Sequence, residues 1–439
     1  MSVEDIHLQI SRELKVGTHP GDLLDLIDEL PIDEKASLMQ MLPDSDAALI
    51  FKEMEDFEQA EILRLLSKGQ AAQILKNLAS DDAADLIGEL SPEEAQDMLE
   101  LIGEEEALDF SDLLKYPEES AGGIMTTEYI SLTGDIPVEE AITRLREIAP
   151  EAETIYYVYV VDEGNHLIGV LSLRELIAAV DGTLLKNIMR RNIISVNASL
   201  DQEEVARLVS KYDLLSVPVV DDEERLLGII TVDDVIDVME QEATEDIYRL
   251  AGAGEVEGME LTRASVGKVA RLRLPWLLIS LIGGIVSGTV IGAFENTIEA
   301  IVVLAVFIPV LMGMGGNVGT QSSTIFVRGL ATGEIKEGEV WSYFFRETKV
   351  GLAMGVICGL LISAIAFMWQ GNPYLGLVVG LSMLITISIA TLIGTLVPLL
   401  FNKLNIDPAI TAGPFVTTIK DFTGLVIYFV LATLFLQYL

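Results

Sequence analysis

The chain has 439 residues, of which 28 are Lys or Arg and 68 are Asp or Glu, so its formal net charge is −40. Such a charge excludes nucleic acid as a partner by repulsion and favours divalent cations, which carboxylate oxygens bind. A merely solvated acidic surface explains the composition equally well. The single cysteine, Cys358, excludes an internal disulfide and a cysteine-based zinc site. The acidic excess lies before Leu261 and the remainder is apolar, which predicts soluble domains followed by a membrane domain.

Residues 1–120 predict an all-α N-terminal domain. Helix-length runs are separated by similar breaks, such as Glu29-Leu-Pro-Ile-Asp and Leu90-Ser-Pro-Glu-Glu. Ser or Asp at a break can cap the next helix, Pro suits its first turn, and acids there complement the helix dipole. We therefore expect a small superhelix of helical repeats. A partner-binding scaffold and a part of a sensor are equally consistent with it.

Residues 121–180 and 181–237 form a duplication, from which we predict two further domains. Ile124-Met-Thr-Thr, with a strand-like segment behind it, recurs as Ile188-Met-Arg-Arg. Each copy continues with an amphipathic helix, an apolar strand ending in Val-Val-Asp, and a second strand that leads into a helix. This order and spacing resemble a tandem pair of CBS domains, which are α/β units that pair around a cleft.

The resemblance to CBS domains implies ATP as a regulatory ligand. In that family a Ser/Thr-x-x-Asp ending can hold an adenosine ribose. The endings here are Ser172-Leu-Arg-Glu175 and Thr231-Val-Asp-Asp234, so Glu replaces Asp in the first. The nucleotide-binding residues implied are Tyr157, Ser172, Arg174 and Glu175. The alternative is that these residues only cap the helix that follows.

Residues 238–273 predict an acidic helix and a juxtamembrane segment that leads to the membrane. Like charges three or four positions apart destabilise an isolated helix, and few Lys or Arg lie nearby. Bound hydrated divalent ions are the simplest source of positive charge, and a solvated acidic face is the alternative. The regulatory metal ligands that we expect are Asp201, Glu203, Asp213, Asp234, Asp237, Glu242, Glu245 and Asp246.

Residues 274–439 predict an all-α transmembrane domain of five helices. The spans are about Pro275–Phe294, Ile298–Phe326, Val350–Trp369, Tyr374–Phe401 and Ile410–Leu439. Each reaches the roughly 20 residues that a helix needs to cross the hydrocarbon. Lys and Arg occur before the first span and in two of the four connections, so the positive-inside rule places the acidic domains in the cytoplasm. An N-terminus without an apolar signal core agrees, and we expect a multi-pass protein of the cell (inner or plasma) membrane with its C-terminus outside.

Polar residues in the second and fifth spans predict a cation pathway. Asp421 lies roughly 15 Å into its span at 1.5 Å per residue, and an acid there costs at least about 2.5 kcal/mol. Neutralisation by Lys420 is the alternative, but adjacent residues on a helix point about 100° apart. One carboxylate with neutral oxygens suits Mg2+, which keeps most of its waters. The pore ligands that we expect are Asp421, Asn317, Gly316, Thr320, Thr324, Thr417 and Gly413.

Together these features resemble the MgtE family of magnesium channels, notably Gly315-Gly-Asn-Val-Gly-Thr-Gln in span two and Pro414-Phe-Val-Thr-Thr before Asp421. The resemblance implies a homodimer in the lipid bilayer, with a pore between the second and fifth spans that conducts hydrated Mg2+ into the cell. It also implies that a plug helix, matching Val238–Gly252, is held shut by cytoplasmic Mg2+ on the acidic region. Some members have Asn at the position of Thr320, which bears on fine selectivity.

Two other function classes stay open at this stage. A nucleotide-sensing transporter of another divalent cation or of an anion would share the CBS pair, although Asp421 argues against an anion pore. A membrane-tethered signalling scaffold would use the helical repeat and leave Asp421 unexplained. The sequence contains no catalytic dyad and no Walker-type loop, so we do not expect an enzyme.

Overall fold

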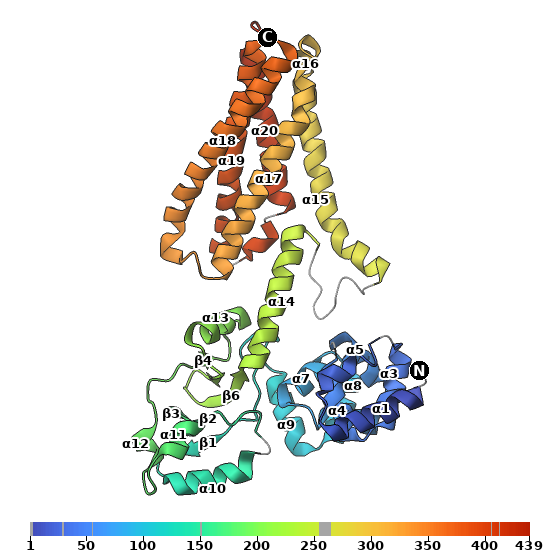
Figure 1. Cartoon of the computed structure of the whole chain (residues 1–439), viewed down its shortest axis with the longest axis vertical. Coiled ribbons are helices and arrows are strands. Elements are labelled where there is room, and N and C mark those ends of the chain that lie inside the picture. Colours follow the sequence, from blue (N-terminus) through green and yellow to red (C-terminus); the bar gives the residue numbers. More distant parts are fainter. Residues whose placement is uncertain are drawn as a thin grey trace. The chain divides into compact units, whose positions relative to one another are not determined.

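The computed structural model describes residues 3–28, 30–54, 56–149, 152–253, 265–404, 406–411 and 413–439. The chain divides into two compact units, Met1–Gln241 and Glu242–Leu439 (Figure 1). The expected break at Glu29 and residues 254–264 of the expected juxtamembrane segment lie outside the described residues. The expected fold class is confirmed: among the described residues, a helical N-terminal domain, two similar α/β units and five apolar helices follow one another.

The N-terminal domain is a superhelix of short helices. They are α1 (Val3–Val16), α2 (Pro20–Leu24), α3 (Ile32–Met41), α4 (Asp44–Lys52), α5 (Asp56–Leu65), α6 (Lys68–Leu75), α7 (Ser80–Gly88), α8 (Pro92–Ile102) and α9 (Glu104–Leu113). From α1 onward each helix packs against the helix two places further along, so the chain winds around one core that includes Leu38, Phe51 and Ile74. Ser91 begins α8 through a capping box with Glu94, as the repeated breaks predict.

The CBS pair consists of two similar three-stranded sheets. The first copy has β1 (Ser131–Thr133), α10 (Val138–Ile148), β2 (Tyr157–Val161), β3 (Leu167–Ser172), α11 (Leu173–Ala178) and α12 (Leu185–Ile188). The second has β4 (Val196–Asn197), α13 (Gln202–Tyr212), β5 (Ser216–Val220), β6 (Leu226–Thr231) and α14 (Val232–Ala251). In each sheet the first pairing is parallel and the second antiparallel, and Ser172 and Thr231 occupy equivalent register positions. A hydrogen bond of 2.8 Å between the Tyr159 hydroxyl and Ser216 Oγ joins the copies.

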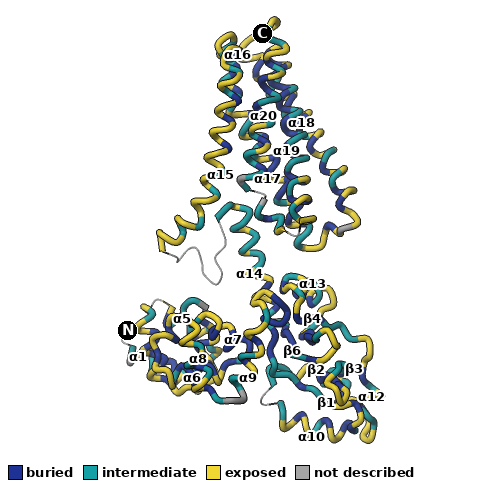
Figure 2. The backbone as a smooth tube through the Cα atoms, turned by 180° about the vertical axis from the view of Figure 1, so that it is seen from behind, coloured by how far each residue is buried: buried dark blue, intermediate teal, exposed yellow. Residues whose placement is uncertain are grey.

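The second unit holds five helices that are long and apolar enough to cross a membrane. Its elements are α15 (Val266–Ala293), α16 (Glu295–Ala300), α17 (Leu304–Ala331), η2 (Glu337–Glu339), α18 (Val340–Gln370), α19 (Pro373–Lys403), η3 (Pro408–Thr411) and α20 (Pro414–Leu434). The central helix is α19, which packs against α17, α18 and α20, whereas α15 contacts mainly α20 and is largely exposed (Figure 2). Small residues bring α18 and α19 close: a Cβ atom at Gly359 would stand 2.7 Å from the Gly380 carbonyl oxygen.

The helix bounds differ from the expected spans at two places that matter for the site. The third membrane helix begins ten positions earlier than expected, at Val340, because its Arg and Glu residues do not interrupt the helix. The fifth begins at Pro414, which stands in its first turn, where proline costs no hydrogen bond. Asp421 therefore lies about 10 Å along α20, not 15 Å, at 1.5 Å per residue.

Candidate functional site

The polar motif of α17 divides over two faces of the helix. One face is packed: Gly319 is buried, and a Cβ atom at Gly394 of α19 would stand 2.5 Å from its carbonyl oxygen. The other face carries oxygen atoms, and Asn317 and Thr320 on it are exposed. This second face holds Asn317, Thr320 and Thr324, within an arc of about 60° at 3.6 residues per turn, and Gly316 lies at its border with the packed face. The small residues therefore serve helix packing, and the side-chain oxygens point away from it.

On α20 the expected ligands Thr417 and Asp421 stand one turn apart on a half-buried face. The Thr417 hydroxyl donates a hydrogen bond of 3.0 Å to the Gly413 carbonyl, so both groups are engaged within the first turn. In the part of the chain that the structure describes, the Asp421 carboxylate has no ion pair and no hydrogen bond. Asp421 thus keeps its ligand capacity, while Thr417 and Gly413 use part of theirs on each other.

Lys420 makes one of the contacts between α17 and α20. This side chain is only 3% exposed and lies along the groove that Gly316 and Gly319 form on α17. No ion pair joins Lys420 to its neighbour Asp421 within the described residues. The alternative in which Lys420 neutralises Asp421 by direct pairing is therefore wrong for this structure, and Gly316 faces an ammonium group.

In the first unit, three of the expected regulatory acids have local roles on α13. The Asp201 carboxylate caps the helix by accepting a hydrogen bond from the Glu203 amide, and the Glu203 carboxylate lies 2.7 Å from Arg207. Asp213 ends the helix in the left-handed region with φ of 52°. Each residue stabilises the helix that it belongs to, whether or not it also binds metal.

Asp234 lies instead among carboxylates that were not expected. Asp81 and Asp82, at the start of α7, interact electrostatically with Asp234 and with Glu153. The Lys52 ammonium lies 3.1 Å from Asp82 and 3.9 Å from Glu153. We name this set the acidic cluster: Asp81, Asp82, Glu128, Glu153 and Asp234. The Asp81–Asp82 pair in the sequence resembles a helix cap, which is why the pattern did not reveal it.

Burial perturbs the titration of the acidic cluster. Burial, with the nearby Asp82, Asp234 and Glu153 charges, raises the pKa of Asp81 well above its ordinary value. Burial likewise raises the pKa of Glu128 to about 7 and that of Asp234 to about 6. Among the described residues, Asp81 Oδ1 is buried without a hydrogen-bond partner, whereas Asp82 Oδ2 lies 3.1 Å from the Lys52 ammonium. Asp81 Oδ1 thus lacks the positive charge that a cation would supply.

The acidic cluster fits a hydrated ion better than a bare one. Among the described residues no three His, Cys, Asp or Glu side chains converge closely enough to hold a metal ion directly. Mg2+ binds proteins through one or two carboxylates while keeping several waters, so such convergence is not required.

In the second unit, an arginine of the protein itself neutralises acidic residues at the end of α14. Arg249 pairs with Glu245 one turn earlier and with Asp407 before η3. A Cβ atom at Gly413 would stand 3.3 Å from the Leu250 carbonyl oxygen, so the end of α14 also packs on the start of α20. Glu245 therefore has a basic partner in the structure, although few Lys or Arg lie near it in the sequence. Asp237, Glu242 and Asp246 also have interaction partners.

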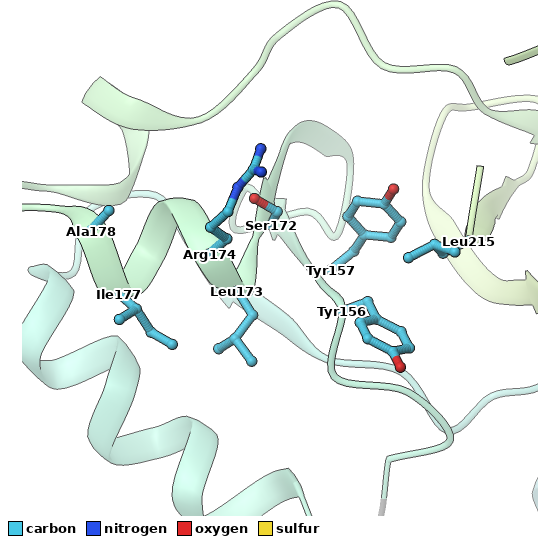
Figure 3. Close-up of a pocket in the computed structure, with 8 residues that line it drawn as sticks. All are labelled: Tyr156, Tyr157, Ser172, Leu173, Arg174, Ile177, Ala178 and Leu215. Atoms are coloured by element: carbon cyan, nitrogen blue, oxygen red, sulfur yellow. The ribbon is translucent and has the colours of Figure 1, made fainter. Parts of the chain in front are cut away.

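The four residues expected to bind a nucleotide line two neighbouring cavities in the CBS pair. Figure 3 shows the larger, of about 600 Å³, with the Ser172 hydroxyl and the Arg174 guanidinium beside the Tyr157 ring. Glu175 and Arg190 line the smaller cavity, of about 300 Å³. The Ser172 hydroxyl and amide both donate to Glu175, which in turn pairs with Arg190 at 2.6 Å. The capping role expected as the alternative is present in the structure.

Comparison with known proteins gives a consistent result. The family model of the MgtE divalent cation transporters matches residues 308–431, that of the MgtE intracellular N domain matches 18–119, and the CBS domain model matches 121–182 and 185–241. The magnesium transporter MgtE of Thermus thermophilus is 44% identical over 327 residues, which are 74% of this chain and 72% of that protein. The magnesium transporter MgtE of Bacillus subtilis is 42% identical over 325 residues, or 74% and 71% of the two chains.

Among solved structures, the cytosolic domain of the Mg2+ channel MgtE in complex with ATP is 43% identical to this chain. It covers 52% of this chain and 93% of the solved one, with a TM-score of 0.49.

Proposed function

The chain belongs to the MgtE family of magnesium transporters, and from that premise we propose that it conducts Mg2+ into the cell through a pore lined by α17 and α20. The observation that carries the proposal is Asp421, a carboxylate inside a membrane helix without a partner in the described residues. An acid in that position is costly unless it serves an ion pathway. The neutral oxygens of Asn317, Thr320 and Thr324 supply hydrogen-bond acceptors for the waters of a hydrated ion.

The pore is completed by a second copy of the chain. Asn317 and Thr320 are exposed on the surface of a single chain, where their polar groups would otherwise face lipid. A symmetric pair encloses this face and contributes two copies of Asp421. We place the N-terminal unit in the cytoplasm, since Lys and Arg flank the membrane helices at that end, and the C-terminus outside.

Gating by cytoplasmic Mg2+ is the second part of the proposal. The carboxylates of the acidic cluster repel one another when no cation is bound, and the buried Asp81 Oδ1, which has no hydrogen-bond partner among the described residues, offers a ligand. Bound Mg2+ stabilises the closed state because it shifts the equilibrium by its greater affinity for that state. The acids that we assign to this regulation are the acidic cluster together with Asp201, Glu203, Asp213, Asp237, Glu242, Glu245 and Asp246.

We also propose that a nucleotide binds as a regulatory ligand in the cavities around Tyr157 and Arg174. An aromatic ring can stack on a base and a guanidinium can bind a phosphate. Calorimetry of the full-length protein with ATP tests this, with Arg174→Ala and Tyr157→Ala as variants. Equal heats for wild type and both variants would remove the assignment.

The decisive experiment for the pore is Mg2+ uptake in cells that lack their own magnesium transporters. Wild type should restore uptake and Asp421→Asn should not. Glu299→Gln, which removes an acid on α16 outside the proposed pathway, is the matched control. Uptake by Asp421→Asn equal to wild type, at equal membrane abundance, would refute the pore assignment.

A further inference from the structure

Lys420 lies on the buried face of α20, and the residues one turn before and after it on this face are uncharged. Val416 and Gly424, one turn to either side, are also buried. A Cβ atom at Gly319 would stand 3.1 Å from Lys420 Cδ, and one at Gly316 would stand 3.2 Å from Lys420 Nζ. The glycines of α17 therefore make the room that this side chain fills.

The Lys420 side chain lies against α17 and does not reach the surface of the bundle. Its Cδ atom lies beside Gly319 and its ammonium beside Gly316, and the residue is 3% exposed. A lysine that merely tolerated the membrane would turn its ammonium toward the nearer surface. In the described part of the chain no hydrogen bond or ion pair reaches the Lys420 ammonium. The charge is thus held inside the helix bundle by packing.

The position of this charge relates it to the pore carboxylate. Lys420 and Asp421 are adjacent in sequence and diverge by about 100° on the helix, so the two charges act on each other without forming a contact. In a low-dielectric interior a fixed charge acts over such distances. The Lys420 ammonium lowers the negative potential at Asp421, and it repels a divalent cation there twice as strongly as a monovalent one.

Resting on the proposed function of Asp421, we propose that Lys420 is a fixed counter-charge that weakens the hold of Asp421 on the passing Mg2+. Conduction requires binding that is favourable enough for the ion to enter and weak enough for it to leave. Two carboxylates facing each other across a dimer axis would retain a divalent ion. A buried ammonium behind each carboxylate shortens the time for which the divalent ion stays bound.

The test is Mg2+ influx into liposomes containing the full-length protein, measured as initial rate against external Mg2+ concentration. Lys420→Met, which matches the side-chain length without its charge, should lower the half-saturating concentration several-fold and lower the maximal rate several-fold. Lys420→Gln should do the same, and it replaces the Met variant if that variant does not fold. Lys420→Arg keeps the charge and should keep the half-saturating concentration near that of wild type.

A purely structural role gives a different pattern, in which the maximal rate falls while the half-saturating concentration stays constant or rises. That pattern in the neutral variants would overturn the proposal. Asp421→Asn separates this failure from failure of the pore assignment. If Asp421→Asn conducts like wild type, the pore assignment itself is wrong. If it is inactive while the neutral Lys420 variants keep the wild-type half-saturating concentration, only the counter-charge is wrong.

Discussion

Arg249, in the last turn of α14, forms an ion pair with Asp407, which lies 158 positions further along the chain in the segment before α20. The Asp407 carboxylate also accepts a hydrogen bond of 2.8 Å from the Ala409 amide, so the pair attaches α14 to an ordered turn of the membrane unit. The same guanidinium binds Glu245. One residue thus supplies the end of the proposed plug helix with an attachment that needs no metal.

Removing this attachment should make the channel easier to open. Arg249→Gln leaves Glu245 and Asp407 without their shared cation, and the loss of a partly buried charge pair destabilises the attached state. We expect a higher open probability at low cytoplasmic Mg2+, measured by patch recording, with Arg249→Lys intermediate because a single ammonium cannot bind both acids as a fork does. An open probability that is unchanged in Arg249→Gln would contradict the attachment.

Cytoplasmic pH should alter Mg2+ inhibition through the acidic cluster. Protons compete with Mg2+ for carboxylates, and the pKa values of Glu128 and Asp234 are raised to about 7 and about 6, largely by burial. Inhibition by Mg2+ should therefore weaken as pH falls from about 7.5 to about 5.5. Recordings at fixed Mg2+ across this range measure it. The same shift in a variant carrying Glu128→Gln and Asp234→Asn would assign the effect to other groups.

The same pKa shifts predict how stability depends on pH without Mg2+. A raised pKa means that the folded state binds more protons than the unfolded state, so the stabilisation is present at low pH and is lost as pH rises through the folded pKa. In a chelator, the unfolding temperature of the first unit within the full chain should fall between about pH 5 and pH 7. Saturating Mg2+ should reduce this slope, and an equal slope with and without Mg2+ would argue against a site there.

Neutralising Asp81, the most buried member of the acidic cluster, should raise the unfolding temperature without Mg2+ and reduce the increase that Mg2+ causes. Asp81 is 7% exposed and close to Asp82, so Asp81→Asn removes a buried like-charge repulsion. Without Mg2+ we expect a higher unfolding temperature than in wild type, and with Mg2+ a smaller increase. Asp46→Asn, in the first turn of α4 and outside the acidic cluster, is the matched control: it can lower the unfolding temperature slightly through the helix dipole, but the increase caused by Mg2+ should be that of wild type. A Mg2+-dependent increase of wild-type size in Asp81→Asn would exclude Asp81 as a ligand.

The sequence indicates those features that depend on period and hydropathy. The duplication around Ser172 and Thr231 was recognisable because both copies bury the same strand pattern, and the membrane helices because each is apolar throughout. Of the acidic cluster only Asp234 was expected, because the members come from α7, from the segments that precede β1 and β2, and from α14. No local pattern joins segments so far apart.

The sequence also did not predict which face of a helix a polar side chain occupies. Asp421 and Lys420 are neighbours in sequence, and only the groove made by Gly316 and Gly319 decides that the lysine is buried. The pairing of Arg249 with Asp407 likewise depends on how two distant segments pack, whereas its pairing with Glu245, four positions earlier, is a local contact of the helix.

The packing of α17 against α19 should limit transport as strongly as the polar residues do. A Cβ atom at Gly394 would stand 2.5 Å from the Gly319 carbonyl oxygen and 3.2 Å from Ser322 Cβ, and backbone cannot yield as a flexible side chain can. Gly394→Ala should therefore displace α17, lowering both Mg2+ uptake and the unfolding temperature in detergent.

Gly288→Ala on α15, where no atom lies within 4 Å of the added methyl group, is the matched control. Because helix propensity favours Ala over Gly by about 1 kcal/mol, this control should be neutral or slightly stabilised. Wild-type uptake by Gly394→Ala would show that the oxygen-bearing face of α17 tolerates displacement, which a pathway built on Asn317 and Thr320 does not allow.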